Sequence, residues 1–184
     1  MFISDHNNIT IRKATPTDCY EIANVHINSW REAYSNFLPK SYLDSRPLAF
    51  KSKAEMWSQN ITNESQSIFV AECETRGIIG FISGSKGRER RHKDKLEVRC
   101  LYLFQKYHGQ KIGFRLLQAL FDTYHTLGFN MGYLWVLKDN PTISFYQKVG
   151  GQYNGNSKTC EIEGQLITED CYFWNSLSGL KSKN

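Results

Sequence analysis

The segment LEVRCLYLFQKYHGQKIGF, residues 96–114, decides the fold because it runs from a strand through a glycine-containing bend into a helix. Residues 96–103 are rich in apolar side chains, as a buried strand is. From residue 112 onward, apolar residues recur at helical spacing, and Gly128 stands where a helix would end. The apolar positions of this face are Ile112, Leu116, Leu117, Leu120, Phe121, Tyr124 and Leu127. A strand joined directly to a helix predicts a mixed α/β fold.

The bend between Gly109 and Gly113 can bind an anion. The first turn of a helix has unsatisfied backbone N–H groups, and the helix dipole adds partial positive charge there. That geometry suits phosphate, and glycine lets the anion approach the backbone closely. The spacing matches neither G-x-G-x-x-G nor the G-K-[ST] of a P-loop. From spacing alone, an ordinary strand-to-helix turn remains the alternative.

A second informative segment is NPTISFYQKVG, residues 140–150. Asn140 is expected to cap a short helix, and Pro141 suits its first turn. Tyr146 then lies on that helix. Its hydroxyl either faces a leaving group or belongs to a side chain that only packs.

The remaining chain alternates strand-like and helix-like segments without a repeat or linker. Thr15-Pro16-Thr17-Asp18 predicts a helix start, with the helix fading near 34–37, and Pro39 and Pro47 punctuate a second helical region reaching about Trp57. Further strands are expected at 9–13, 67–72, 77–83, 132–137, 153–160 and 170–174. We expect one domain over residues 1–184, with its core at about 9–176.

Composition indicates a globular protein without structural metal or disulfides. The chain has 184 residues, 40% hydrophobic and 14% aromatic. No apolar stretch approaches the roughly 20 residues that span a bilayer, and Met1–Thr10 is polar, so we expect a cytoplasmic location. The five cysteines form no C-x-x-C pair, and no H-E-x-x-H occurs. We expect reduced thiols and no metal.

Part of the net charge of +5 is concentrated in residues 86–95, which hold six basic and two acidic side chains. Such a segment is usually a solvated hairpin tip, or else a patch that attracts an anionic partner. Aromatic residues do not interleave with the basic ones, which disfavours a nucleic-acid platform.

In combination, these motifs resemble the GNAT superfamily of N-acetyltransferases over most of the chain. The resemblance rests on Leu101-Tyr102-Leu103, the run Tyr107–Gly113 with Leu116-Leu117, and Asn140 with Phe145-Tyr146. Ile11–Thr15 with Asp18 is similar to that family's first strand and helix entry. Trp30-Arg31-Glu32-Ala33-Tyr34 with Leu38-Pro39 resembles a W-R-x-x-Y…L-P variant of one branch.

The resemblance implies a twisted, mostly antiparallel sheet whose fourth and fifth strands splay apart around acetyl-CoA. The main chain of Leu101, Tyr102 and Leu103 would pair with the pantetheine arm, and the Leu103 amide would polarise the thioester carbonyl. Asn140 would contact the cofactor arm, and Tyr146 would stand near the sulfur. The pyrophosphate would be held by backbone N–H groups of His108, Gly109, Gln110, Lys111, Ile112, Gly113 and Phe114.

The sequence departs from the family's Q/R-x-x-G-x-G/A pattern at two positions. His108 stands at the Q/R position and Lys111 at the central glycine. The Lys111 side chain must turn outward to leave its amide free. Its charge could then also favour a phosphate.

The implied chemistry is direct transfer of an acetyl group to an amine. An alkyl ammonium titrates near pH 10, so the amine needs a base. Glu97 is our candidate, acting through a water; the alternative is an exposed strand residue between basic neighbours. Tyr146 is the candidate acid. A covalent route through Cys100 is disfavoured, because direct transfer needs no nucleophile.

The acceptor is not identified by the sequence. Trp30 and Tyr34 can form an aromatic wall that binds the amine, although core packing explains them equally well. The acceptor is a small-molecule or protein amine, and pairing of edge strands leaves a homodimer open. Two other classes remain: a non-catalytic module that binds acyl-CoA, and a nucleic-acid-binding protein using residues 86–95.

Overall fold

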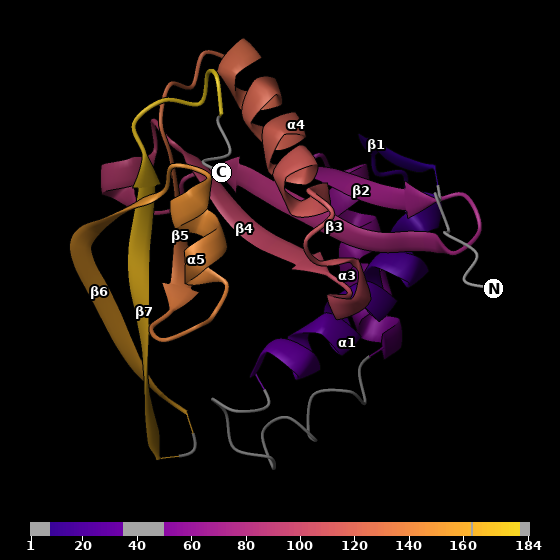
Figure 1. Ribbon diagram of the computed structural model, residues 1–184, viewed down its shortest axis with the longest axis horizontal. Helices are drawn as coiled ribbons and strands as arrows, with labels where there is room; N and C mark the ends of the chain where they lie inside the picture. Colours follow the sequence, from indigo (N-terminus) through magenta and orange to yellow (C-terminus); the bar gives the residue numbers. More distant parts are fainter. Residues whose placement is uncertain (1–7, 35–49, 163, 181–184) are drawn as a thin grey trace.

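The computed structural model describes residues 8–34, 50–162 and 164–180. Within them, seven strands form one sheet in the order β1-β2-β3-β4-β5-β7-β6, shown in Figure 1. Neighbouring strands are antiparallel except β4 and β5, which are parallel. The strands are β1 (Ile9–Lys13), β2 (Ser67–Cys73), β3 (Gly77–Lys86), β4 (Leu96–Leu103), β5 (Gly132–Leu137), β6 (Gln152–Ile162) and β7 (Gln165–Trp174). The predicted α/β fold with a mostly antiparallel sheet is confirmed.

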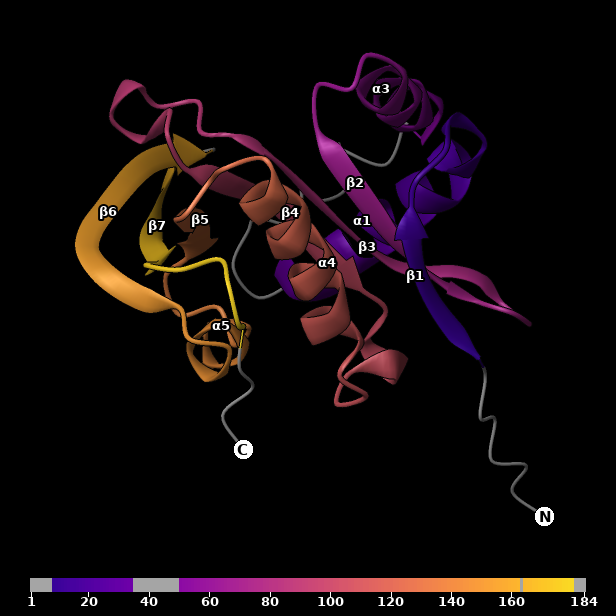
Figure 2. The ribbon, with the colours of Figure 1, turned by 90° about the horizontal axis from the view of Figure 1, so that it is seen from above.

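Helices cover both faces of the sheet, so the molecule has a helix–sheet–helix layering (Figure 2). On one face, α4 (Ile112–Thr126) and α5 (Ile143–Lys148) pack in a cluster with Leu96, Val98 and Leu134. On the other, α1 (Cys19–Tyr34) and α3 (Phe50–Thr62) pack against Val70 and Phe81. Because side chains alternate along a strand, adjacent Phe81 and Ile82 belong to these two different clusters.

The strands β4 and β5 diverge soon after they begin. They pair only at Leu96 with Gly132 and Glu97 with Tyr133. In contrast, β4 pairs with β3 along its whole length, with a bulge at Arg99 between Val98 and Cys100. The edge of β4 that faces β5 therefore lacks a strand partner beyond Glu97. This is the predicted splay.

Local signals set the helix ends. At the entry to α1, the Thr15 amide donates to Asp18 Oδ2 at 2.7 Å, and Arg12 Nη1 lies 2.7 Å from the same oxygen. After α4, Gly128 has a φ of 89° and its N–H donates to His125 O, which ends the helix as predicted.

Several element boundaries differ from the sequence prediction: β3 reaches Lys86 instead of residue 83, and β6 reaches Ile162 instead of residue 160. The two largest differences are at α3 and β7. The helix α3 continues to Thr62, five residues past Trp57, and β7 begins at Gln165 instead of residue 170. Within β6 and early β7 most side chains are exposed, so no apolar alternation marks these residues. Among the described helices, none has the length and apolar character needed to cross a membrane. Pro39 and Pro47 lie outside the described residues.

Candidate active site

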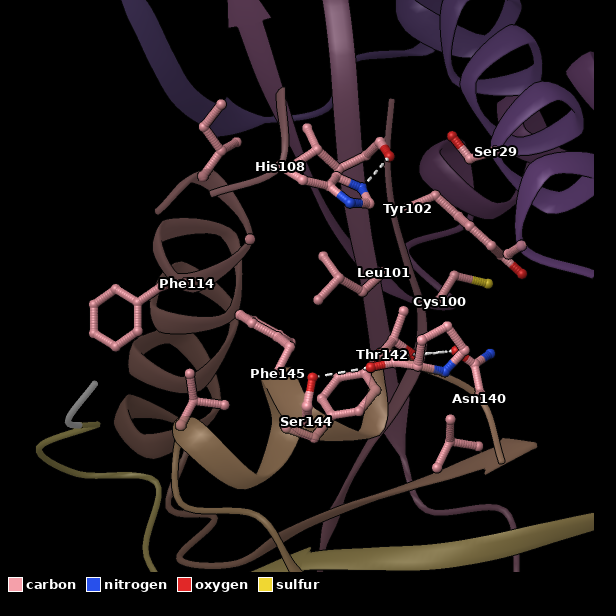
Figure 3. A pocket seen from close by; sticks show the side chains of 18 of the residues that line it. Ser29, Cys100, Leu101, Tyr102, His108, Phe114, Asn140, Thr142, Ser144 and Phe145 are labelled. Atoms are coloured by element: carbon pink, nitrogen blue, oxygen red, sulfur yellow. Dashed lines mark hydrogen bonds between the residues drawn. The ribbon is translucent and has the colours of Figure 1, made fainter. Parts of the chain in front are cut away.

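A cavity of about 760 Å³ lies where β4 and β5 diverge (Figure 3). Its walls come from β4, from the bend and first turn of α4, from β5, and from the segment 140–149 that includes α5. Residues of α1 line it on the opposite side of the sheet. Of the residues predicted for the site, the lining includes Leu101, Tyr102, Leu103, His108, Gly109, Lys111, Ile112, Gly113, Phe114, Asn140 and Tyr146.

The bend leaves a run of backbone donors open. Within the described residues, the six amides from Gly109 to Phe114 donate to no protein acceptor, and the first helical bond runs from the Arg115 amide to Lys111 O. The His108 amide differs from the prediction, because it donates to Gln105 O at 3.0 Å. A row of open amides at a helix N-terminus can hold an anion.

The backbone conformation explains why glycine suits this bend. Gly109 has a φ of 77° and Lys111 a φ of 59°, both in the left-handed region. For Lys111 this conformation is strained, because an L-residue brings its Cβ close to the backbone there. The side chain is exposed, which leaves the Lys111 amide accessible as the predicted phosphate contact requires. At Gly113, an added Cβ would lie 3.4 Å from the Phe145 ring.

The unpaired edge of β4 offers main-chain groups to the cavity. The Phe104 amide donates to Ile79 O on β3, so the polar groups of Leu103 and Leu101 face the opposite, unpaired edge. His108 Nε2 lies 3.0 Å from Leu103 O, which ties the bend to the end of the strand (Figure 3).

Asn140 and Tyr146 carry structural roles and also line the cavity. Asn140 Oδ1 accepts from the Thr142 amide at 2.9 Å and from Thr142 Oγ1 at 2.7 Å. Asn140 therefore holds the turn before α5, whose N-cap is Thr142 and not Asn140 as predicted. No described residue accepts from its Nδ2 group, which remains able to donate. Tyr146 is buried, and its ring packs edge-on against Phe145 and Trp174.

Glu97, the predicted base, is buried at the closed end of the splay and does not line the cavity. Its carboxylate accepts from Arg88 Nη2 at 2.6 Å, from the Arg88 amide at 3.1 Å and from the Tyr133 hydroxyl at 3.1 Å. Burial opposes ionisation, but the hydrogen bonds from Arg88 hold the pKa of this carboxyl below its usual value. A paired carboxylate of low pKa is a poor base. The alternative of an exposed strand residue is contradicted as well, because only 4% of Glu97 is exposed.

The α1 side of the cavity contains residues that the sequence analysis did not assign to the site. Ser29, Glu32 and Ala33 line it from α1, and Arg99 and Cys100 from β4. The sequence feature that could have assigned Ser29 to the site is a hydroxyl on the otherwise apolar face of a helix. Burial raises the pKa of the Cys100 thiol, which keeps it protonated and argues against a covalent route.

The predicted aromatic wall is not reproduced by Trp30, which is half-buried and absent from the described lining. Gln110 is likewise outside the lining. Tyr34 is the last residue of α1. Leu38 and Pro39 lie outside the described residues.

Three of the six basic side chains in residues 86–95 pair with carboxylates in or next to this segment. Arg88 pairs with Glu97, Arg91 with Glu89, and Lys95 with Asp94. Among the described residues, no group of three or more His, Cys, Asp or Glu side chains is arranged so that it could hold a metal ion. All five cysteines are free.

Comparisons with known proteins match this architecture. Residues 27–151 match the model described as the acetyltransferase (GNAT) family. The N-acetyltransferase YuaI of Bacillus subtilis (strain 168) is 30% identical over 174 residues, which cover 95% of this chain and 97% of YuaI.

Two solved structures show the same fold. The PaiA N-acetyltransferase of Thermoplasma acidophilum, in complex with coenzyme A, has a TM-score of 0.67 at 24% identity and covers 88% of this chain and 98% of its own. YncA of Salmonella typhimurium, with its cofactor acetyl-CoA, has a TM-score of 0.68 at 15% identity. The match covers 97% of this chain and 99% of YncA.

Proposed function

Because the chain belongs to the GNAT family and is an N-acetyltransferase, we propose that it moves an acetyl group from acetyl-CoA directly to an amine in a ternary complex. The observation that carries this proposal is the row of open amides from Gly109 to Phe114 beside an unpaired strand edge. Two structural neighbours are complexes with coenzyme A or acetyl-CoA. We treat residues 1–184 as one domain for this function.

The donor site fits the two chemically distinct parts of the cofactor. The open amides suit the pyrophosphate, since each can donate one hydrogen bond and the helix dipole adds positive charge. The free edge of β4 at Leu101 and Leu103 can pair with the amide-containing arm as a strand would. Asn140 Nδ2 is a further donor at the same cavity.

The chemistry needs a polarised carbonyl, a neutral amine and a proton for the leaving sulfur. Acetyl-CoA supplies the acetyl group as a thioester. A β4 amide at the open edge, that of Leu103, polarises its carbonyl, and Tyr146 donates the proton to the sulfur. The attacking species is the fraction of the amine that has already lost its proton to bulk solvent, because the Glu97 carboxylate is paired with Arg88.

The test is thermal stabilisation by acetyl-CoA, followed by release of free thiol when amines are added. A ligand at 100 times its Kd stabilises the folded state by about 2.7 kcal/mol. Gly113→Leu should remove this stabilisation, because the new side chain meets Phe145 beside the open amides. Thr126→Leu, at the exposed far end of α4, is the matched control and should keep it. An unchanged melting temperature of the wild type at millimolar acetyl-CoA would reject the proposal.

A further inference from the structure

The cavity is lined by an unpaired positive charge, that of Arg99 next to Cys100 on β4. Arg99 is the bulged position of β4, and it is partly buried. It takes part in none of the ion pairs or side-chain hydrogen bonds of the described residues. A guanidinium offers five N–H donors in a planar fork that matches an oxyanion, so a partly desolvated and unpaired one is a strong recognition group.

A second unused donor, the Ser29 hydroxyl, lines the same cavity. Ser29 is 5% exposed, and no described residue, backbone included, hydrogen-bonds its Oγ. A serine within a helix commonly bonds back to a carbonyl one turn earlier, and Ser29 does not. Figure 3 shows its hydroxyl on the side of β4 to which Cys100 and Tyr102 point, away from Leu101. Leaving a buried hydroxyl without a partner costs free energy unless a ligand satisfies it.

The electrostatics of this side also favour an anion. Burial, together with the charge of Lys53 on α3, lowers the pKa of His26 to about 3, so His26 is neutral next to Tyr102. The charges of Arg99 and Lys53 likewise act to lower the pKa of the Cys100 thiol, although burial raises it overall. Arg99 and Lys53 therefore both act on groups of this side, and Glu32 lines the cavity one turn beyond Ser29 on α1.

We propose that the acceptor is a small amine that also carries a carboxylate, an amino acid or a close analogue, whose carboxylate binds Arg99 and Ser29. This inference rests on the proposed function. The single positive charge of the Arg99 guanidinium balances the single negative charge of the acceptor carboxylate. The ammonium first loses one proton to solvent. The neutral nitrogen then attacks the thioester carbon: a C–N bond forms, the C–S bond breaks, and the thiolate receives the hydroxyl proton of Tyr146. The second nitrogen proton leaves through water and restores the Tyr146 hydroxyl. The products are an N-acetyl amino acid and free CoA.

The experiment compares matched acceptors with acetyl-CoA as donor. The panel holds the L-amino acids, their α-carboxamides and the corresponding decarboxylated amines, and release of free thiol gives kcat/KM. We expect the wild type to prefer acids over their carboxamides. Arg99→Gln should reduce kcat/KM for the preferred acid by about 10- to 100-fold while changing the value for its carboxamide little, because only the acid bonds the guanidinium.

Variants and controls separate this assignment from its premise. Ser29→Ala should reduce the same preference by a smaller factor, and Arg90→Gln, an exposed arginine outside the cavity, should leave it unchanged. Thermal stabilisation by acetyl-CoA should persist in Arg99→Gln, which shows that the variant folds. Equal losses for acids and carboxamides, or no preference in the wild type, would overturn the inference. Stabilisation by acetyl-CoA without turnover of any amino acid would overturn it too, whereas loss of stabilisation in the wild type would overturn the proposed function itself.

Discussion

The two ends of β4 differ in whether their polar groups have partners. At the closed end, the buried Glu97 carboxylate accepts from Arg88 and from Tyr133, and the strand pairs on both edges. At the open end, the amides from Gly109 to Phe114, Arg99 and the Ser29 hydroxyl have no partner in the described residues. Buried polar groups are normally satisfied within a fold. By this rule the buried Ser29 hydroxyl is the exception, whereas the amides of Gly109, Gln110 and Lys111 belong to exposed residues. The contrast therefore separates groups that hold the splay together from groups that remain open to a ligand.

The largest expected effect is at the open end, where Tyr146→Phe removes the proposed proton donor. The Tyr146 hydroxyl is proposed to donate its proton in the transition state, and it is not needed for binding of the substrates in the ground state. Loss of a general acid costs about 10²- to 10⁴-fold in rate, and a thiolate is a good leaving group, so we expect turnover to slow by about 10²-fold. The ring is retained, so the KM for acetyl-CoA should change little. Steady-state kinetics with a good amine acceptor measure both.

The control for Tyr146→Phe is the variant Tyr172→Phe, which changes a buried tyrosine of β7 outside the cavity lining. It should leave kcat within about twofold of the wild type. If Tyr146→Phe also stays within about twofold, the residue only packs against Phe145 and Trp174 and the proton comes from elsewhere.

The closed end predicts the opposite pattern for Glu97→Gln, a loss of stability without a loss of catalysis. Hydrogen bonds to a charged group contribute about 1.5–3 kcal/mol, so the free energy of unfolding should fall by about 2 kcal/mol. The pKa of Glu97 is held below the ordinary value of 4.5. The stabilising effect of the carboxylate is therefore complete above pH 4.5 and is lost as pH falls through the folded-state pKa.

Urea denaturation between pH 7 and pH 3 measures this difference. Glu161→Gln, an exposed carboxylate in β6, is the matched control and should unfold as the wild type does. If Glu97→Gln instead slows turnover by about 100-fold or more with little loss of stability, Glu97 is the base after all and the contrast between the two ends disappears.

Much of the fold was predictable because its signals are local. The α4 face, the stop at Gly128 and the β5 limits depend on periodicity and turn chemistry within a few residues. The early part of β7 was missed because Gln165 and Leu166 are exposed and form a ladder with β6, which carries no apolar alternation. That pairing depends on a distant partner and not on the segment itself.

The site residues also fall into those with a local sequence signal and those that depend on the packed structure. Asn140 and the bend residues that line the cavity could be named from the sequence because a motif marks their positions along the chain, whereas Gln110 of the same motif lies outside the lining. The Arg88–Glu97 pair was missed because nine residues separate the partners and only the β3–β4 turn brings them together. Ser29 and Arg99 were missed because their significance is the lack of a partner, which only the packed structure reveals.

The smallest expected effect concerns the strained backbone conformation of Lys111 in the bend at the open end. A left-handed conformation costs an L-residue about 1–2 kcal/mol, and glycine avoids that cost while losing about 0.5–1 kcal/mol through unfolded-state entropy. Lys111→Gly should therefore raise the free energy of unfolding by about 0.5–1 kcal/mol. Lys111→Ala keeps the strain and removes the charge, so it should match the wild type in urea denaturation. Both variants should lose the same few-fold of acetyl-CoA affinity, more at low salt, if the ammonium group contacts a phosphate. Should glycine prove no more stable than alanine, strain at this bend would play no part in shaping the open end.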